Sequence, residues 1–102
     1  MSSIKIRSKR LENGTEIRCL ITHPMANGRK KDTAGNPIPA HHIENLWLEH
    51  NNTLIMRVDM AGSISRNPYF DFVLTSALKG DIVKISWADN LGQTDSQEHT
   101  LS

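Results

Sequence analysis

A chain of 102 residues is long enough for one hydrophobic core, and a chain of this size buries roughly 65% of the surface that it exposes when unfolded. Apolar residues make up 37% of the chain and charged residues 23%, which excludes a disordered protein. Twelve Lys and Arg against eleven Asp and Glu leave a net charge of +1, too little to draw the protein onto nucleic acid or an anionic membrane. We therefore expect a single domain over residues 1–102.

Alternation of apolar and polar residues is the main pattern along the chain, and it predicts half-buried strands. Turn signals such as Glu12-Asn13-Gly14 and Asn51-Asn52 separate the strands at short intervals. The expected strands are a short one around residues 4–6, then residues 17–21, 43–50, 54–60, 70–74, 83–87 and 93–101. Seven short antiparallel strands predict an all-β, immunoglobulin-like sandwich, with a small open barrel as the alternative.

Two long connections interrupt the strands, at residues 23–40 and 61–68. The second includes the one candidate for a helical turn, residues 61–66. Loops longer than about 12 residues in a compact domain are usually functional or disordered. The spaced prolines and glycines of the first loop are typical of defined turns, so we expect that loop to be ordered.

A metal or redox site built on Cys19, His23 and Met25 is the first chemistry to consider. Blue-copper sites combine these residue types, but with the Cys, Met and one His close together near the C-terminus and the other His far upstream. Cys19 shares a strand face with Ile17 and Ile21, which predicts a small buried thiol. The remaining histidines show no paired ligand spacing, so the sequence predicts no metal and no cofactor.

Catalytic groups are equally hard to assemble from this sequence. A Cys nucleophile needs an exposed, electropositive setting, which Cys19 is not expected to have. The segment Gly28-Arg29-Lys30-Lys31 resembles a phosphate-binding loop in composition only, not in spacing or context. The sequence therefore favours a binding protein over an enzyme.

Candidate interface residues come from the first loop and from apolar positions outside the expected core. Met25 follows Pro24 in the loop, and methionine adapts to irregular contacts. Tyr69 is either a contact residue or a packing residue. The full candidate set is Pro24, Met25, Arg29, Lys30, Lys31, Leu46, Leu48, Ile55 and Tyr69. The three basic residues are otherwise a solvated loop edge, and Met56 and Met60 are expected in the core.

Three segments in this order resemble the SoxZ family of the bacterial sulfur-oxidation (Sox) system: THPMANGRKKDTAGNPIPAHHI, SRNPYFDF and ISWADNLGQT. The resemblance extends over nearly the whole chain. It implies an immunoglobulin-type sandwich and a non-catalytic partner of SoxY, the carrier whose C-terminal cysteine holds the substrate of thiosulfate oxidation. This chain ends in Glu98-His99-Thr100-Leu101-Ser102, without that cysteine, so it is not expected to be the carrier itself.

The resemblance also implies partners and a location. We expect a heterodimer or higher heteromer with SoxY, transient contact with other Sox enzymes, and possible homodimers of the isolated chain. The first ten residues lack the apolar run of a signal peptide, which by itself indicates the cytosol. Family members reach the periplasm by co-export with SoxY, so periplasmic residence is expected here.

Two questions remain open at this stage. The loop after His23 is either an interaction element anchored by Pro24 and Met25, or a plug in which Pro37-Ile38-Pro39 and His23 close the end of the sandwich. The alternative function is a standalone β-sandwich redox or metal protein that uses Cys19 and His23.

Overall fold

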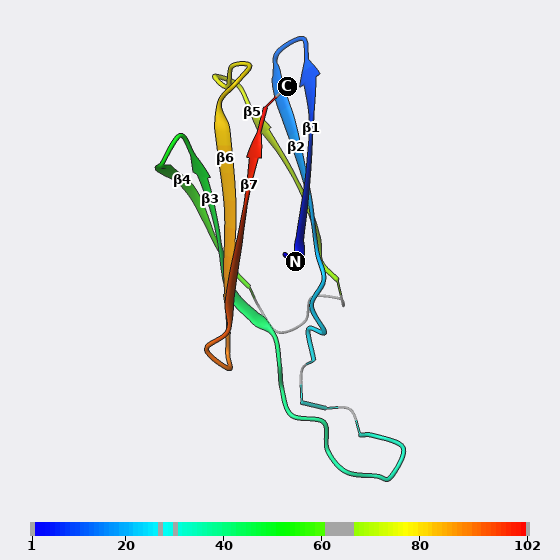
Figure 1. The fold of residues 1–102 in the computed structure, drawn as a ribbon. Helices are drawn as coiled ribbons and strands as arrows, with labels where there is room; N and C mark the ends of the chain where they lie inside the picture. The colour runs from blue at the N-terminus through cyan, green and yellow to red at the C-terminus, as the bar shows by residue number, and fades with distance from the viewer. Residues whose placement is uncertain (1, 27, 30, 61–66, 102) are drawn as a thin grey trace.

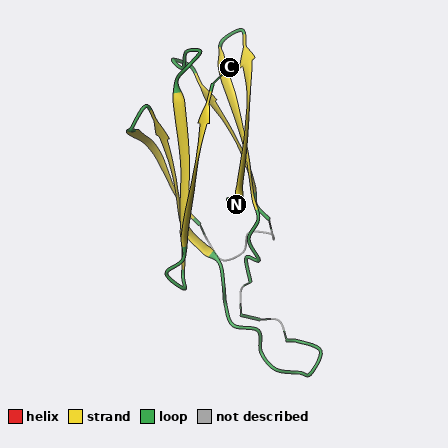
Figure 2. Cartoon of the chain, in the orientation of Figure 1, coloured by secondary structure: helices red, strands yellow, loops and turns green. Residues whose placement is uncertain are grey.

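The computed structural model describes residues 2–26, 28–29, 31–60 and 67–101. These residues form an all-β structure with two antiparallel sheets and no helix (Figures 1 and 2). The strands are β1 (Ile4–Leu11), β2 (Gly14–Ile21), β3 (Ile43–His50), β4 (Thr53–Asp59), β5 (Tyr69–Leu74), β6 (Ile82–Asp89) and β7 (Thr94–Thr100). One sheet has the order β1-β2-β5 and the other β4-β3-β6-β7, which confirms the predicted immunoglobulin-like sandwich.

The core lies between the two sheets and follows the period of two that the sequence shows. Ile17, Cys19 and Ile21 of β2 are completely buried, and the inward side chains of β6, Val83 and Ile85, face them from the other sheet. Cross-strand pairing continues this inner face into β3, where Leu48 lies opposite Ile85. The expected burial of Cys19 is confirmed.

Leu46 and Leu48 were predicted to lie on an outer, partner-binding face, and that prediction is wrong. Both side chains belong to the core. Residues 46–48 are Leu-Trp-Leu, so alternation alone does not say which side of the strand faces inward. Pairing of Leu46 with Trp87 and of Leu48 with Ile85 fixes the register and leaves Trp47 on the outer face.

The two long sides of the sandwich differ. On one side β1 packs beside β7, and polar side chains join them: the Asp95 carboxylate accepts hydrogen bonds from the Ser3 backbone N–H and hydroxyl at 2.7 Å, and Ser8 lies 3.0 Å from His99. The other side is bounded by the edge strands β4 and β5. Apolar side chains there are only half-buried against the core: Met56, Val58, Phe70, Phe72 and Leu74.

The first long connection projects from one end of the sandwich, which gives the molecule a long dimension of 52 Å against 24 and 22 Å (Figure 1). Isolated bridges pair Ala26 with His41 and Lys31 with Pro37. At the tip, one Asp32 carboxylate oxygen accepts hydrogen bonds from the N–H groups of Ala34 and Asn36, both at 2.9 Å. The predicted defined turns are therefore present. The helical turn expected at residues 61–66 lies outside the described residues.

Candidate partner-binding surfaces and the polar cluster at the loop root

A buried cluster of His23, His41 and Asp89 lies where the projecting loop, residues 24–42, joins the sandwich. His23 lies two residues after the end of β2, His41 lies two residues before β3, and Asp89 ends β6. The Nε2 atoms of His23 and His41 lie 3.2 and 2.7 Å from the same carboxylate oxygen of Asp89. His23 is 3% exposed and the Asp89 side chain is completely buried, whereas the His41 side chain is 26% exposed.

The hydrogen bonds around the cluster fix the tautomer of His23. Its Nδ1 atom accepts the backbone N–H of Met25 at 3.1 Å, so the ring of neutral His23 carries its proton on Nε2 and donates it to Asp89. The other oxygen of Asp89 accepts the backbone N–H groups of Leu91 and Gln93 at 3.0 and 2.8 Å. The cluster is therefore a chain of directed hydrogen bonds, from backbone to ring to carboxylate.

Burial and hydrogen bonding act on these groups in opposite ways. Burial is the largest effect on His23 and lowers the pKa of its imidazole, although the hydrogen bond to Asp89 opposes this. Burial alone would raise the pKa of the Asp89 carboxyl. The hydrogen bonds from Gln93, His23, His41 and Leu91 outweigh burial and lower that pKa. A neutral imidazole bonded to a charged carboxylate is the state that both shifts favour.

The donor atoms of the cluster lie within 4.8 Å of one another, which is close enough for one metal ion. The chemistry of His23 disfavours this use. A histidine that binds a metal through Nε2 normally carries its proton on Nδ1 and donates it to a second group. Here Nδ1 faces the N–H donor of Met25, so metal binding would break that hydrogen bond or require an imidazolate. The cluster is therefore better suited to hydrogen bonding and proton binding than to coordination of a metal ion.

Ligand spacing along the chain does not reveal this cluster. The three residues are brought together by topology: the loop returns to its starting point, so His23 and His41 at its two ends meet. Asp89 stands at the last position of β6 before a turn, directly beside them. Polar residues at both ends of one long loop were the available signal.

Met25 is not a surface residue, and Cys19 does not have the exposed setting that a redox site needs. Met25 was predicted as an exposed contact, but it is only 6% exposed and belongs to the core. The backbone has a φ of 48° at Met25, and its sulfur accepts the N–H of Ile43 at 3.4 Å. His23 and Met25 thus plug the end of the sandwich, whereas Ile38 and Pro39, which the plug hypothesis also named, are exposed.

Burial raises the pKa of the Cys19 thiol to about 12.

The other predicted interface residues lie on the surface but not in one patch. Pro24, Arg29 and Lys31 are exposed along the projecting loop, and Lys30 lies outside the described residues. Ile55 is exposed on β4 and Tyr69 on β5. The structure therefore separates the candidates into a loop group and an edge-strand group.

The edge strands carry exposed apolar residues beyond those predicted from the sequence. Besides Ile55 and Tyr69, Leu54 on β4 and Val73 on β5 are about half exposed. Together with the half-buried inward side chains of the same strands, they give this open side an apolar character. We define the open side as the described residues of β4 and β5.

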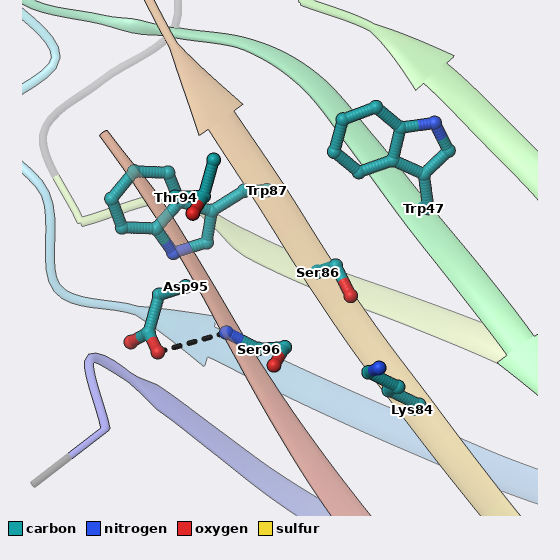
Figure 3. A pocket seen from close by; sticks show the side chains of 7 residues that line it. All are labelled: Trp47, Lys84, Ser86, Trp87, Thr94, Asp95 and Ser96. Carbon is teal, nitrogen blue, oxygen red and sulfur yellow. Dashed lines mark hydrogen bonds between the residues drawn. The ribbon is translucent and has the colours of Figure 1, made fainter. Parts of the chain in front are cut away.

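A second feature is a shallow hollow on the β4-β3-β6-β7 sheet, next to Trp47 (Figure 3). Trp47 pairs across the sheet with Ser86, which in turn pairs with Ser96, and these small side chains leave space beside the indole. Lys84 and Asp95 also line the hollow. One carboxylate oxygen of Asp95 accepts a hydrogen bond from the Ser96 N–H, and the other accepts one from the Ser3 hydroxyl. Both oxygens of Asp95 therefore already have hydrogen-bond partners within the chain.

The fold and these surfaces define a small immunoglobulin-like β-sandwich with one apolar, incompletely covered side and a projecting loop tied down by a buried polar cluster. The chain belongs to the SoxZ family, because the model of the family described as Sulphur oxidation protein SoxZ matches residues 4–100. The family resemblance stated from the sequence is confirmed, and with it a role in the sulfur-oxidation Sox system. No curated protein matches the chain. The described residues include no helix long and apolar enough to cross a membrane.

Proposed function

We propose that this protein is a non-catalytic scaffold that binds and stabilises SoxY, the carrier whose C-terminal cysteine holds the substrate of thiosulfate oxidation. The two form a heterodimer or higher heteromer in the periplasm, which this chain reaches by co-export. Membership of the SoxZ family supports the proposal. The observation that carries it is the open side, where the inward apolar side chains of β4 and β5 stay half-buried.

The open side suits a protein partner for two physical reasons. Burying apolar surface contributes about 25 cal/mol per Å², and the half-buried side chains such as Phe72 and Val58 still offer such surface. Each of β4 and β5 also ends its sheet, so its outer edge presents backbone N–H and C=O groups that a strand of SoxY can pair with. An apolar strand of SoxY along this side would complete the sandwich.

The projecting loop supplies a second, smaller contact in this proposal. The loop extends beyond the end of the sandwich (Figure 1), and Pro24, Arg29 and Lys31 are exposed along it. A stable complex commonly buries more than about 2,000 Å² in total, which the loop alone does not provide. The loop therefore adds specificity, toward the carrier arm or a docking Sox enzyme, while the open side provides most of the affinity.

Capture of this chain by tagged SoxY tests the proposal. We expect Leu54→Lys and Ile55→Lys, on the open side, to weaken the complex at least about tenfold, which is about 1.4 kcal/mol. Leu91→Lys is the matched control, because Leu91 is equally exposed but lies in the turn between β6 and β7. Equal binding of all three variants would reject the open side as the interface, and failure of the unmodified chain to bind SoxY would reject the scaffold function.

The alternative of a standalone redox or metal protein has less support. It requires Cys19 and His23 to act together, yet Cys19 is completely buried with a raised thiol pKa, and the groups clustered with His23 are His41 and Asp89. Colour or redox activity of the purified chain would favour that alternative.

A further inference from the structure

We propose that His23, His41 and Asp89 form a proton-operated clamp: it holds the root of the projecting loop against the sandwich when His23 is neutral and releases it when His23 is protonated. The clamp is a property of this chain alone. It does not depend on which partner the loop meets.

The clamp joins both ends of the loop to one fixed point. Asp89 is held in place by the backbone N–H groups of the turn that follows it, so its second oxygen has a defined position. His23 binds that oxygen from the start of the loop and His41 from its end. The two rings lie edge to face with their centroids 4.6 Å apart, so they pack against each other as well as against Asp89.

Backbone hydrogen bonds at the root depend on the same arrangement. Ala26 and His41 exchange two backbone hydrogen bonds of 2.7 and 2.8 Å, directly beside the clamp. Asn90, next to Asp89, accepts the N–H of His42 at 2.8 Å and donates to the Ala40 carbonyl at 2.9 Å. Opening of the clamp therefore also weakens the backbone pairs that hold the two ends of the loop together at its root.

Protonation of His23 acts at the atom that faces Met25. The incoming proton adds to Nδ1, where it meets the N–H of Met25, so an accepting contact of 3.1 Å becomes two opposed donors. The root must open before water can solvate the charged ring. In the closed state the Asp89 carboxylate favours the charged ring, whereas burial and the neighbouring His41 and His42 disfavour it.

The direction of the pH effect follows from these contacts. The pKa of His23 is lowered below its ordinary value of 6.5 in the closed state, while a released, solvated His23 titrates near 6.5. The free energy by which the clamp stabilises the closed loop root is therefore complete above pH 6.5. It is lost as the pH falls below 6.5, toward the lowered pKa of His23. Asp89 stays ionised over this window because its own pKa is lowered from 3.8.

Amide hydrogen exchange at Ala26 and His41 in the isolated chain tests the clamp. After correction for the intrinsic exchange rate, we expect their protection to fall at least about threefold between about pH 7 and pH 5. The His23→Asn variant keeps an oxygen near the position of Nδ1 to accept the Met25 N–H but does not titrate, so its protection should not change with pH. His41→Gln keeps a donor for Asp89 and should retain the pH dependence, because His23 is the trigger.

His50→Asn is the matched control, because His50 makes a similar Nε2 contact of 2.8 Å to Asp81, away from the loop, and should leave the pH dependence unchanged. A flat profile in the unmodified chain, or an unchanged profile in His23→Asn, would overturn the clamp. So would loss of the pH dependence on adding one equivalent of Zn²⁺, because the cluster would then be a metal site. If His23→Asn fails to fold, emission of Trp87, whose ring centroid lies 5.1 Å from that of His23, reports the same titration in a Trp47→Phe background.

Discussion

Replacing Asp89 by Asn probes how much the buried cluster contributes to stability. The side-chain oxygen of Asn can still accept the Leu91 and Gln93 N–H groups, but an NH₂ group then faces the Nε2–H of both histidines. Hydrogen bonds to charged groups contribute about 1.5–3 kcal/mol each. His41 is partly exposed and can turn to water, whereas His23 is buried and cannot.

We expect Asp89→Asn to lower the free energy of unfolding by about 2–4 kcal/mol. The value lies below the sum of two charged hydrogen bonds, because the substitution also removes the desolvation cost of a buried carboxylate. For a domain of this size the change corresponds to a fall in Tm of about 10–20 °C. Urea unfolding followed by circular dichroism at about pH 7.5 measures the free energy directly.

The matched variant is Asp81→Asn, which removes a similar carboxylate–histidine contact from a more exposed pair. We expect a clearly smaller loss there, because water replaces much of that contact. A loss at Asp89 below about 0.5 kcal/mol, or one equal to that at Asp81, would refute the reasoning that burial makes the cluster strong.

Three further predictions concern other groups. Cys19 should resist alkylation by iodoacetamide at pH 8 in the folded chain and react on unfolding, since its thiol is buried with a pKa of about 12; mass spectrometry would detect early labelling that contradicts this. Met25→Glu should destabilise the isolated chain by at least about 2 kcal/mol rather than act on partner binding alone, because the side chain is buried; unchanged urea stability would be the contrary result. The pKa values of Asp81 (about 2) and Asp95 are lowered from 3.8, so the stability they provide is present above 3.8 and lost as pH falls through the lowered values; an acid titration by circular dichroism that shows no loss below pH 3.8 would contradict this.

The sequence was sufficient for the fold because most strands alternate cleanly. Residues 17–21 place Ile17, Cys19 and Ile21 on one face, and one face of such a strand must be buried. The Leu46-Trp47-Leu48 run carries no such alternation, so its inward face was decided only by pairing with β6. Propensity and period do not determine register where every residue is apolar.

The site was harder to predict because it depends on contacts between distant segments. Met25 follows a proline in a loop, and its burial depends on a positive φ and on a contact with Ile43 that sequence spacing does not reveal. The exposed sides of β4 and β5 were only partly identified, since Ile55 and Tyr69 were chosen but Leu54 and Val73 were not. Exposure at an edge depends on which strands remain without a neighbour, and that is a property of the whole topology.

The loop root and the open side are separate features of this domain. Loops of this length are uncommon in compact domains. Here the root of the loop is fixed by the buried carboxylate of Asp89 and by Met25. On the open side, β4 and β5 keep half-buried apolar side chains, which is the surface proposed to bind SoxY. The two surfaces share no described residue, so a change at the loop root should alter loop order while the apolar contact persists. Leu54→Lys should do the reverse, because it removes apolar surface far from Asp89 along the chain and leaves every hydrogen bond of the root in place.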